Sequence, residues 1–380
     1  MQVYLLYIRL TLSLLLLWWS ESSNAQSLEK PWMLGPFVKA DSTNPIMGRD
    51  TTTNFYCPIR QKVLHWEAKD VFNPCAVVKD GKVYLLYRAE DFEGKHKGTS
   101  RIGLAVSEDG IHFERHSTPV LYPKNDSLKT KEWEGGCEDP RIVEGPDDTY
   151  YMTYTAYSGN AIYLALASSQ NLLDWEKHGV IAGIGQVFPA EGGFKAGMIV
   201  SELVGDRLVA KKISGQYWMY WGVGTLRLAV SNDLITWERV KDESGSDLVV
   251  LGPRPSTQYA EVDNLAVEAG PAAVYTDDGI VVFYNGIYNP LPLEERVPTP
   301  AGPNFGNGWC GVQALFNKDD PTKLIDRAEQ PSIKPDRPYE LRGQIPNVTF
   351  VEGLVHFNGK WFAYYGTADS FIAVAVADAD

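Results

Sequence analysis

The chain has 380 residues, of which 44% are hydrophobic and 22% are charged, an ordinary balance for a soluble globular protein. Its 48 acidic and 35 basic side chains give a formal net charge of −13. Because nucleic acids and anionic membranes attract concentrated Lys and Arg, this balance argues against both as partners and favours a neutral ligand.

The first 25 residues have the pattern of a secretory signal peptide. Arg9 precedes an apolar run from Leu10 to Trp19, and Ser23-Asn24-Ala25 supplies the small residues that a signal peptidase requires. We therefore expect residues 1–25 to be removed, the mature protein to be periplasmic or extracellular, and no membrane span to remain. The alternatives are a buried N-terminal helix and a membrane anchor, because residues 3–8 lengthen the apolar run.

The chain contains four cysteines, which are widely spaced and form no C-x-x-C pair: Cys57, Cys75, Cys137 and Cys310. This spacing argues against a zinc site and against a small disulfide-rich scaffold. We expect free, mostly buried thiols, with one disulfide as the alternative, and we expect neither a metal nor a cofactor.

One pattern recurs along the chain after a polar lead-in segment at residues 27–56. Each copy has two strand-like runs, and the clearest copies end in a turn with an aromatic-acidic pair. The paired runs are 83–88 with 101–114, 150–155 with 161–176, 216–221 with 226–238, 279–286 with 310–316, and 360–366 with 371–376. Acidic residues of the turns, such as Asp109, Asp174 and Asp233, recur with the pattern, so we interpret them as turn residues.

Short β-branched and aromatic runs that repeat every several tens of residues are typical of a β-propeller. Segments with helical periodicity are nearly absent. The sequence therefore predicts an all-β protein in which residues 26–380 form a single five-bladed β-propeller. A β-sandwich or a β-helix is the alternative, although a sandwich does not explain the repeat.

Polar residues interrupt or end these apolar runs, and the innermost strands of a propeller would bring them to one axis. The most prominent stretch is Trp133–Arg141, where Glu138 and Asp139 are followed by Pro140 and Arg141. Charged groups flanked by apolar strands either pair with one another or contact a ligand. The candidates are Asn73, Arg88, Asp139, Arg141, Lys195, Glu268, Asn285 and Asp369.

Several motifs together resemble glycoside hydrolase family 130, a family of five-bladed propellers that act on β-mannosides. The most specific of them is Glu138-Asp139-Pro140-Arg141 in its glycine-rich context. The others are Phe72-Asn73-Pro74, Tyr87-Arg88, the run 101–113, Glu268-Ala269-Gly270-Pro271, Pro346-Asn347-Val348-Thr349-Phe350 and the run 364–369.

The resemblance implies that Asp139 is the general acid, which in the family's phosphorylases acts through a hydroxyl of the bound mannosyl unit. It also implies that several of the polar residues line sugar subsites, and Asn285 is a further candidate for substrate binding. The implied subsite residues are Asn73, Arg88, Ser100, Arg141, Lys195 and Asp369.

The family contains inverting phosphorylases and inverting hydrolases, which differ in what faces the attacking group. Phosphate requires cations, whereas hydrolysis requires a carboxylate that deprotonates water. The resembling phosphorylases carry an arginine at the end of the third-copy strand, but here that strand ends at Trp221-Gly222 and the next arginine is Arg227. Glu268 matches the candidate base of the hydrolases. The hydrolases also tend to carry another glutamate soon after the third-copy strand, but the corresponding position here, near Val223, is apolar.

We therefore expect an exported inverting β-mannosidase that cleaves β-1,2 linkages in a β-mannoside oligosaccharide, with Asp139 as acid and Glu268 as base. Glu261 and Glu202 are weaker base candidates. The first alternative is a phosphorylase that uses inorganic phosphate and releases mannose 1-phosphate, if Lys195, Lys211, Lys212 and Arg227 assemble an anion site. The second is a non-catalytic sugar-binding propeller. The protein is expected to be a monomer or a homodimer, and the proline-rich residues 288–308 are a candidate cover or contact.

Overall fold

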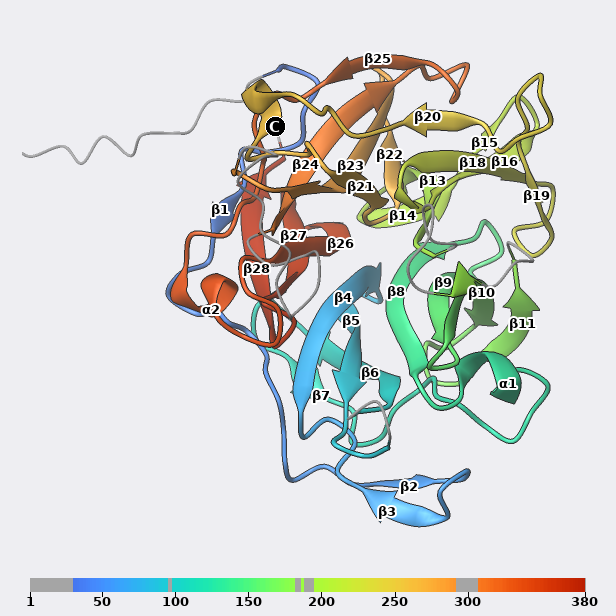
Figure 1. Cartoon of the computed structure of the whole chain (residues 1–380), viewed down its shortest axis with the longest axis vertical. Helices are drawn as coiled ribbons and strands as arrows, with labels where there is room; N and C mark the ends of the chain where they lie inside the picture. The colour runs from blue at the N-terminus through green and yellow to red at the C-terminus, as the bar shows by residue number, and fades with distance from the viewer. Residues whose placement is uncertain (1–29, 95–97, 182–185, 188–194, 292–306, 380) are drawn as a thin grey trace, which may run out of the picture.

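The computed structural model describes residues 30–94, 98–181, 186–187, 195–291 and 307–379 (Figure 1). The predicted signal peptide lies outside the described residues, as does most of segment 288–308. The prediction of an all-β protein is confirmed. Strands dominate the described residues, and the helical elements there are α1 (Lys129–Glu132), α2 (Pro338–Leu341) and the 3-10 turn η1 (Thr257–Tyr259).

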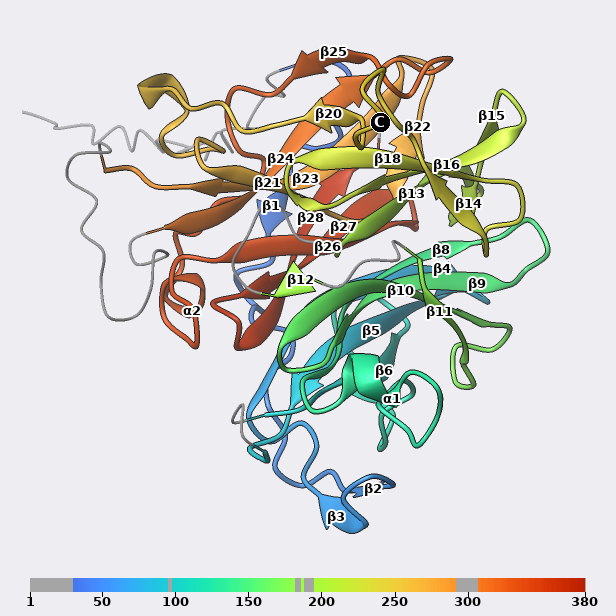
Figure 2. The same ribbon diagram turned by 45° about the vertical axis from the view of Figure 1, so that its right-hand side comes forward.

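The strands form successive antiparallel groups in chain order, here called sheets (Figures 1 and 2). The first contains β4 (Asp70–Lys79), β5 (Lys82–Glu90), β6 (Ser100–Ser107) and β7 (Glu114–Arg115), and the second contains β8 (Gly136–Glu144), β9 (Tyr150–Tyr157), β10 (Ala161–Ser169) and β11 (Glu176–Val180). The third contains β13 (Gly197–Val204), β16 (Gln216–Trp221), β18 (Leu226–Ser231) and β19 (Trp237–Arg239).

The fourth sheet begins with two short strands, β21 (Ala266–Ala269) and β22 (Ala273–Tyr275), which both pair with β23 (Ile280–Tyr288). It continues through β24 (Gly308–Phe316) and β25 (Leu324–Arg327). The fifth contains β26 (Thr349–Phe357), β27 (Lys360–Thr367) and β28 (Phe371–Asp378). Short strands extend these sheets: β12 (Gln186–Val187), β14 (Arg207–Ala210), β15 (Lys212–Ile213), β17 (Val223–Gly224) and β20 (Val249–Leu251). Hydrogen bonds between sheets, such as those of β6 with β8 and of β13 with β22, join the first four sheets to one another.

The lead-in segment contributes strands that the sequence did not predict. β1 (Val38–Lys39) pairs with β28 and so adds an outer strand to the last sheet. β2 (Phe55–Cys57) and β3 (Lys62–Leu64) form a separate hairpin that projects from the body in Figure 1. The N-terminal part of the described chain is therefore held against its C-terminal strand.

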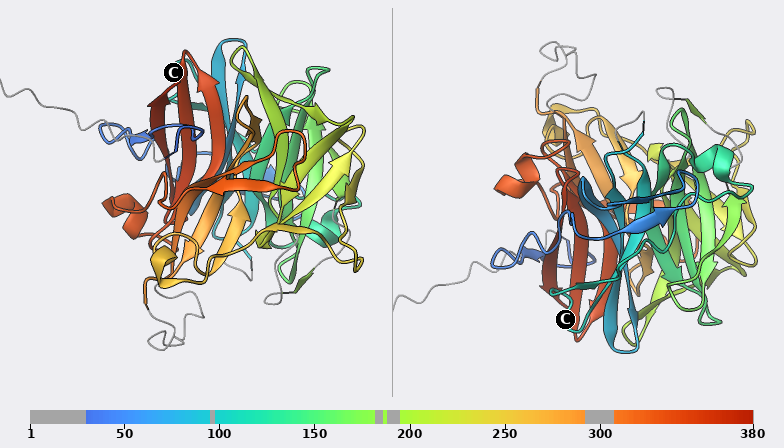
Figure 3. Two further views of the ribbon diagram at one scale, coloured as in Figure 1. Left: turned by 90° about the horizontal axis from the view of Figure 1, so that it is seen from above. Right: turned by 90° about the horizontal axis from the view of Figure 1, so that it is seen from below.

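The first strands of the sheets lie side by side. β26 packs against β4, β4 against β8, β8 against β13, and β13 pairs in parallel with β22. Buried apolar clusters fill the spaces between successive sheets, including one that joins the fifth sheet to the first through Val355, Phe357, Val83 and Leu85. In both views of Figure 3 the fifth sheet (red) lies beside the first (blue), and the second (green) lies on the other side of the first.

The recurring turns are built by side chains that accept backbone hydrogen bonds. The carboxylate of Asp109 accepts from the N–H groups of Ile111 and His112, and Asp233 does the same for the two residues at its turn. In the second sheet Asn171 holds this place, and Asp174 instead accepts from the Asn171 amide. These acidic residues are therefore turn residues, as expected, but the equivalent of Asp109 in the second copy is Asn171.

The four cysteines are free and buried, in agreement with the expectation. Across the described ranges, no helix is both long and apolar enough to cross a membrane.

Candidate active site

The first strands of three sheets, β4, β8 and β26, are irregular, and polar residues lie at the irregularities. The register of β4 shifts between Phe72 and Pro74, and that of β8 shifts between Glu138 and Arg141. Asn73 and Asp139 fall in these shifts and both have positive φ, 48° and 47°. Short polar side chains tolerate this conformation better than bulky ones, and the following prolines remove a ladder donor. The bulges therefore turn both side chains out of the regular alternation.

Asp139 lies at the centre of the resulting cluster and is only 2% exposed. Its Oδ1 accepts hydrogen bonds from Asn73 Nδ2 at 2.9 Å and from Arg88 Nη1 at 3.0 Å. Its Oδ2 lies 3.4 Å from Lys195 Nζ. Three sequence-predicted residues from separate parts of the chain thus meet on one carboxylate.

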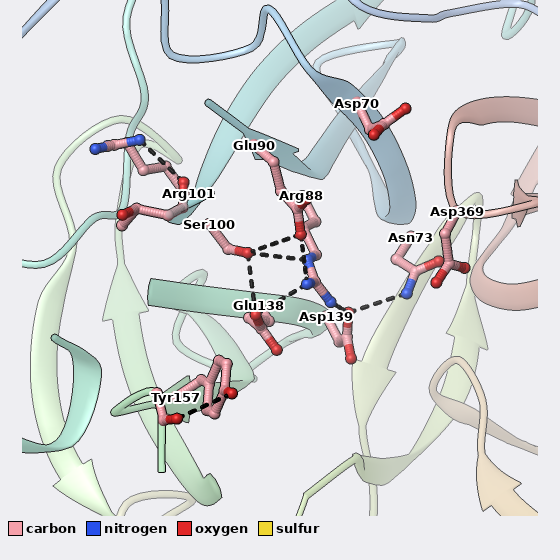
Figure 4. A network of polar contacts seen from close by, with 12 residues as sticks. Asp70, Asn73, Arg88, Glu90, Ser100, Arg101, Glu138, Asp139, Tyr157 and Asp369 are labelled. Atoms are coloured by element: carbon pink, nitrogen blue, oxygen red, sulfur yellow. Dashed lines mark hydrogen bonds and ion pairs between the residues drawn. The ribbon is translucent and has the colours of Figure 1, made fainter. Parts of the chain in front are cut away.

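Arg88 is shared among three carboxylates (Figure 4). Its Nη2 lies 2.7 Å from Glu90 Oε1 and 2.9 Å from Glu138 Oε1, in addition to its bond to Asp139. Ser100 Oγ accepts from Arg88 Nε and donates to Glu138 Oε1 at 3.0 Å. Gly136 permits this approach: its φ is 124°, and a Cβ there would collide with the backbone of Ser100.

Lys195 joins the two predicted catalytic carboxylates. Its Nζ lies 2.8 Å from Glu268 Oε1 and 3.4 Å from Asp139 Oδ2, so these two oxygens are at most about 6.2 Å apart. Lys195 lies just before β13, and Glu268 lies in β21, immediately before the break at Gly270-Pro271. Asp139 and Glu268 therefore face a common centre.

Arg141 connects the strand of Asp139 with the strand of Glu268. Its Nη1 donates to the carbonyl of Asp139, and its Nη2 donates to the carbonyl of Ala269 at 2.7 Å. The same Nη2 lies 2.8 Å from Glu352 Oε1 and 3.8 Å from Glu268 Oε1. Arg141 is only 2% exposed, and these protein groups surround its guanidinium. It therefore links β8, β21 and β26 next to the carboxylate cluster.

Asn285 and Asp369 occupy different situations. Asn285 is fully buried, and its side chain donates to the carbonyl of Val351 and accepts from the N–H of Val351. It therefore links β23 to β26, and both ends of its amide are engaged by backbone. Asp369 is half-buried at the β27–β28 turn and lies beside Asn73 in Figure 4.

The carboxyl groups of the cluster have different pKa values because their surroundings differ in charge. Burial raises the pKa of Glu138 to about 7, against the charge of Arg88 and with repulsion from Asp139 and Glu90. Burial likewise raises the pKa of Asp369 to about 7. Burial alone would also raise the pKa of Asp139, but Arg88, Lys195 and Arg141 outweigh it and hold that pKa well below its usual range. The cations thus favour an ionised Asp139.

Three carboxylates of the cluster were not among the site residues predicted from the sequence: Glu90, Glu138 and Glu352. Glu138 was visible as the neighbour of Asp139, and Glu90 follows Arg88 at the same strand end. Glu352 lies where the register of β26 shifts between Val351 and Gly353, and nothing in its local sequence marks the bulge.

The other candidates have other partners, although Arg227 packs against Gly222, whose backbone contacts Lys195 and Ala269. Glu202 pairs with Lys211, Glu261 lies 3.9 Å from Lys334, Lys212 lies over the ring of Tyr217, and Arg227 lies over that of Trp221. Val223, near which the resembling hydrolases carry another glutamate, is the cross-strand partner of Glu268. An apolar residue therefore stands next to the candidate base. Within the described ranges, no group of three or more His, Cys, Asp or Glu residues is arranged to hold a metal ion.

An all-β chain whose first strands deliver paired carboxylates and cations to one cluster has the features of a carbohydrate-active enzyme. A family model described as beta-1,4-mannooligosaccharide phosphorylase matches residues 38–380. The chain belongs to glycoside hydrolase family 130.

Its relatives include proteins described both as phosphorylases and as hydrolases. A 1,2-beta-oligomannan phosphorylase of Thermoanaerobacter sp. (strain X514) is 32% identical, with 82% of this chain and 91% of that protein covered. A solved glycosyl hydrolase of Bacteroides ovatus is 41% identical at a TM-score of 0.82, with 92% of this chain and 95% of that chain covered.

Another solved structure is 40% identical at a TM-score of 0.82, with 93% of this chain and 98% of that chain covered. It is described with the words "The GH130 family of mannoside phosphorylases contains glycoside hydrolases that target beta-1,2 mannosidic linkages in Candida mannan".

Proposed function

We propose that this protein is an inverting β-mannosidase that hydrolyses β-1,2 linkages, with Asp139 as general acid and Glu268 as general base. The observation that carries the proposal is the charge of the cluster. Arg88, Arg141 and Lys195 are its central cations, and each already contacts at least two carboxylates.

A phosphate dianion would find each of these three cations already engaged by carboxyl groups, and it would lie beside the ionised Asp139. The described cluster contains six carboxyl groups: Glu90, Glu138, Asp139, Glu268, Glu352 and Asp369. The further cations considered for a phosphate site, Lys211, Lys212 and Arg227, contact other groups. Like charges repel strongly where water is excluded, so a neutral water is favoured over phosphate as the attacking group.

Glu268 fits the base because it faces the acid across a shared cation. Inverting carboxyl groups usually stand about 6.5–9.5 Å apart, with water and the sugar between them, whereas the facing oxygens of Asp139 and Glu268 are at most about 6.2 Å apart. The two groups must therefore move apart as the sugar and the water enter. In the free site Lys195 occupies the space between Asp139 and Glu268, so the reaction requires Lys195 to release one of them as the sugar enters.

Asp139 requires a proton before it acts as the acid. A sugar hydroxyl that displaces Lys195 or Arg88 from Asp139 would remove the positive charge that holds its pKa low. Asn73 and Ser100 are polar groups beside the acid and are assigned to the sugar, together with Arg88, Lys195 and the half-buried Asp369. We assign no sugar contact to Asn285, because its amide holds the backbone of Val351.

We further propose that the five sheets are the blades of a five-bladed β-propeller formed by residues 26–380 as one catalytic unit. The apolar clusters between successive sheets, with one between the fifth and the first, support this arrangement.

We also propose export to the periplasm or the extracellular space after removal of residues 1–25, on the basis of the N-terminal sequence pattern.

Phosphorolysis is the second candidate, and the names of the curated relatives favour it. The two candidates share the acid but differ in the need for Glu268, because an enzyme that admits phosphate does not deprotonate water. The β-1,2 linkage is named in the description of a phosphorylase relative and in that of the solved structure whose description mentions hydrolases, so both descriptions support it.

Substitution of either proposed catalytic carboxylate tests the roles. We expect Asp139→Asn and Glu268→Gln each to lower kcat for β-1,2-mannobiose by about 10²–10⁴-fold, the usual contribution of a general acid or base. Asp174→Asn, on an exposed turn, is the matched control and should leave kcat unchanged. A folded Glu268→Gln protein that retains wild-type kcat would refute the assignment of the base.

A further inference from the structure

Glu352 is a buried carboxyl group in the cluster to which the proposed reaction gives no role. It is 1% exposed and lies at the register shift of β26. Neither of its side-chain oxygens has a hydrogen bond of normal geometry within the described residues, although Oε1 lies 2.8 Å from Arg141 Nη2. A buried polar group with so few directed partners is costly to keep, which suggests that it serves the site.

The group that Glu352 contacts, Arg141, sets the relative placement of the two proposed catalytic strands. Arg141 donates to the carbonyl of Asp139 on one side and to the carbonyls of Ala269 and Gly270 on the other. Its Nη2 is 2.8 Å from Glu352 but 3.8 Å from Glu268. Glu352 therefore competes with Glu268 for the same guanidinium nitrogen, and it has the closer contact.

We propose that Glu352 is a positioning residue: by holding Arg141, it fixes the placement of Asp139 against Glu268 and prevents the guanidinium from pairing closely with the base. The proposal rests on the proposed function, because it assumes that Glu268 acts as the base. Glu352 acts through Arg141 and does not itself touch the substrate.

The neighbours of Glu352 indicate the form in which it acts. Burial, together with Asp139 on β8 and Glu268 on β21, raises the pKa of Glu352 well above its usual value, against the charges of Arg141 and Lys195. Cys75 on β4 also faces it, and burial raises the pKa of that thiol, so it adds no charge. The neutral form of Glu352 is thus favoured, with Oε1 beside Arg141 Nη2, and glutamine matches that form.

Three substitutions separate positioning from packing. Glu352→Gln keeps an oxygen for Arg141 and should retain kcat within about 3-fold, with the wild-type pH profile. Glu352→Ala and the volume-filling Glu352→Leu free the guanidinium to move onto Glu268. We expect kcat for β-1,2-mannobiose to fall about 10–100-fold with KM within a few-fold, because small misplacements of reacting groups cost this much.

The pH profile supplies the decisive measurement. A guanidinium that pairs closely with the base favours its ionised form, so the acidic limb of kcat/KM should move to lower pH in the Ala and Leu variants but not in the Gln variant. Glu340→Ala removes another buried glutamate, within α2, and is the matched control: it should lower thermal stability without moving the limb.

Folded Ala and Leu variants with the wild-type kcat and acidic limb would overturn the proposal, and so would a Gln variant as impaired as the Ala variant. If the Glu352→Ala variant does not fold, the Glu352→Leu and Glu352→Gln variants decide the test. The proposed function is tested separately by wild-type turnover with and without phosphate, a comparison that does not involve Glu352.

Discussion

Glu138 and Asp139 are neighbours in sequence but differ in their surroundings. Asp139 contacts Arg88 and Lys195 and accepts from Asn73, whereas Glu138 shares one nitrogen of Arg88 with Glu90. The pKa of Asp139 is consequently lowered, and burial raises that of Glu138 to about 7. Two adjacent carboxyl groups thus provide one anion and one group that titrates near neutrality.

This contrast predicts a pH-dependent effect of Glu138→Gln on stability. Between the unfolded pKa near 4.5 and the folded value of about 7, the native protein binds more protons at Glu138 than the unfolded chain does. The contribution of Glu138 to the free energy of unfolding therefore falls as pH rises through this window. Relative to wild type, Glu138→Gln should gain on the order of 1–3 kcal/mol in stability between pH 4.5 and pH 8.

Urea unfolding of both proteins at the two pH values measures this gain. Glu238→Gln, on the exposed face of β19, is the control and should show a pH-independent difference from wild type. A pH-independent difference for Glu138→Gln as well would contradict the raised pKa of Glu138.

At the scale of the element, the sequence predicted the regular strands but missed the first strand of most sheets. β5, β9, β16, β23 and β27 are continuous apolar runs, and their patterns identified them. β4, β8 and β26 are broken by bulges that carry Asn73, Asp139 and Glu352, so their alternation fails where the site lies. Polar residues in these strands pointed to the site, but the register shifts depend on tertiary contacts and could not be derived.

Asn285 illustrates how packing between strands supports the site. As a polar residue after an apolar run it was a candidate for sugar binding, yet its amide makes paired hydrogen bonds to Val351, just before the bulge that presents Glu352. The sequence identified an unusual residue, and only the packing of β23 against β26 gives it a structural role.

Asn285→Ala should therefore lower both stability and turnover. Loss of two buried hydrogen bonds that leaves Val351 unsatisfied should reduce the free energy of unfolding by about 2–3 kcal/mol, because orphaned buried groups carry a desolvation cost. Chemical denaturation and kcat on β-1,2-mannobiose measure the two effects. Asn232→Ala, on an exposed turn, is the control, and an Asn285→Ala protein that matches this control in stability would contradict the role.

At the scale of the whole molecule, the cluster unites residues far apart in the chain. Asn73, Asp139, Lys195, Glu268 and Glu352 come from five different parts of the sequence and meet because the first strands of the sheets pack side by side. The repeat in the sequence predicted that polar residues from different sheets would meet, but it did not single out Glu352. It was not sufficient to predict that each central cation is already shared by carboxylates, which is the feature that favours water over phosphate.

The most direct test of this account is product analysis of wild-type protein on β-1,2-mannobiose, with β-1,4-mannobiose as comparator, in buffer with and without inorganic phosphate. NMR of the first-formed product reports both its identity and its anomeric configuration. The account predicts free α-mannose from the β-1,2-linked substrate at a rate independent of phosphate. Mannose 1-phosphate that forms only when phosphate is present would contradict it.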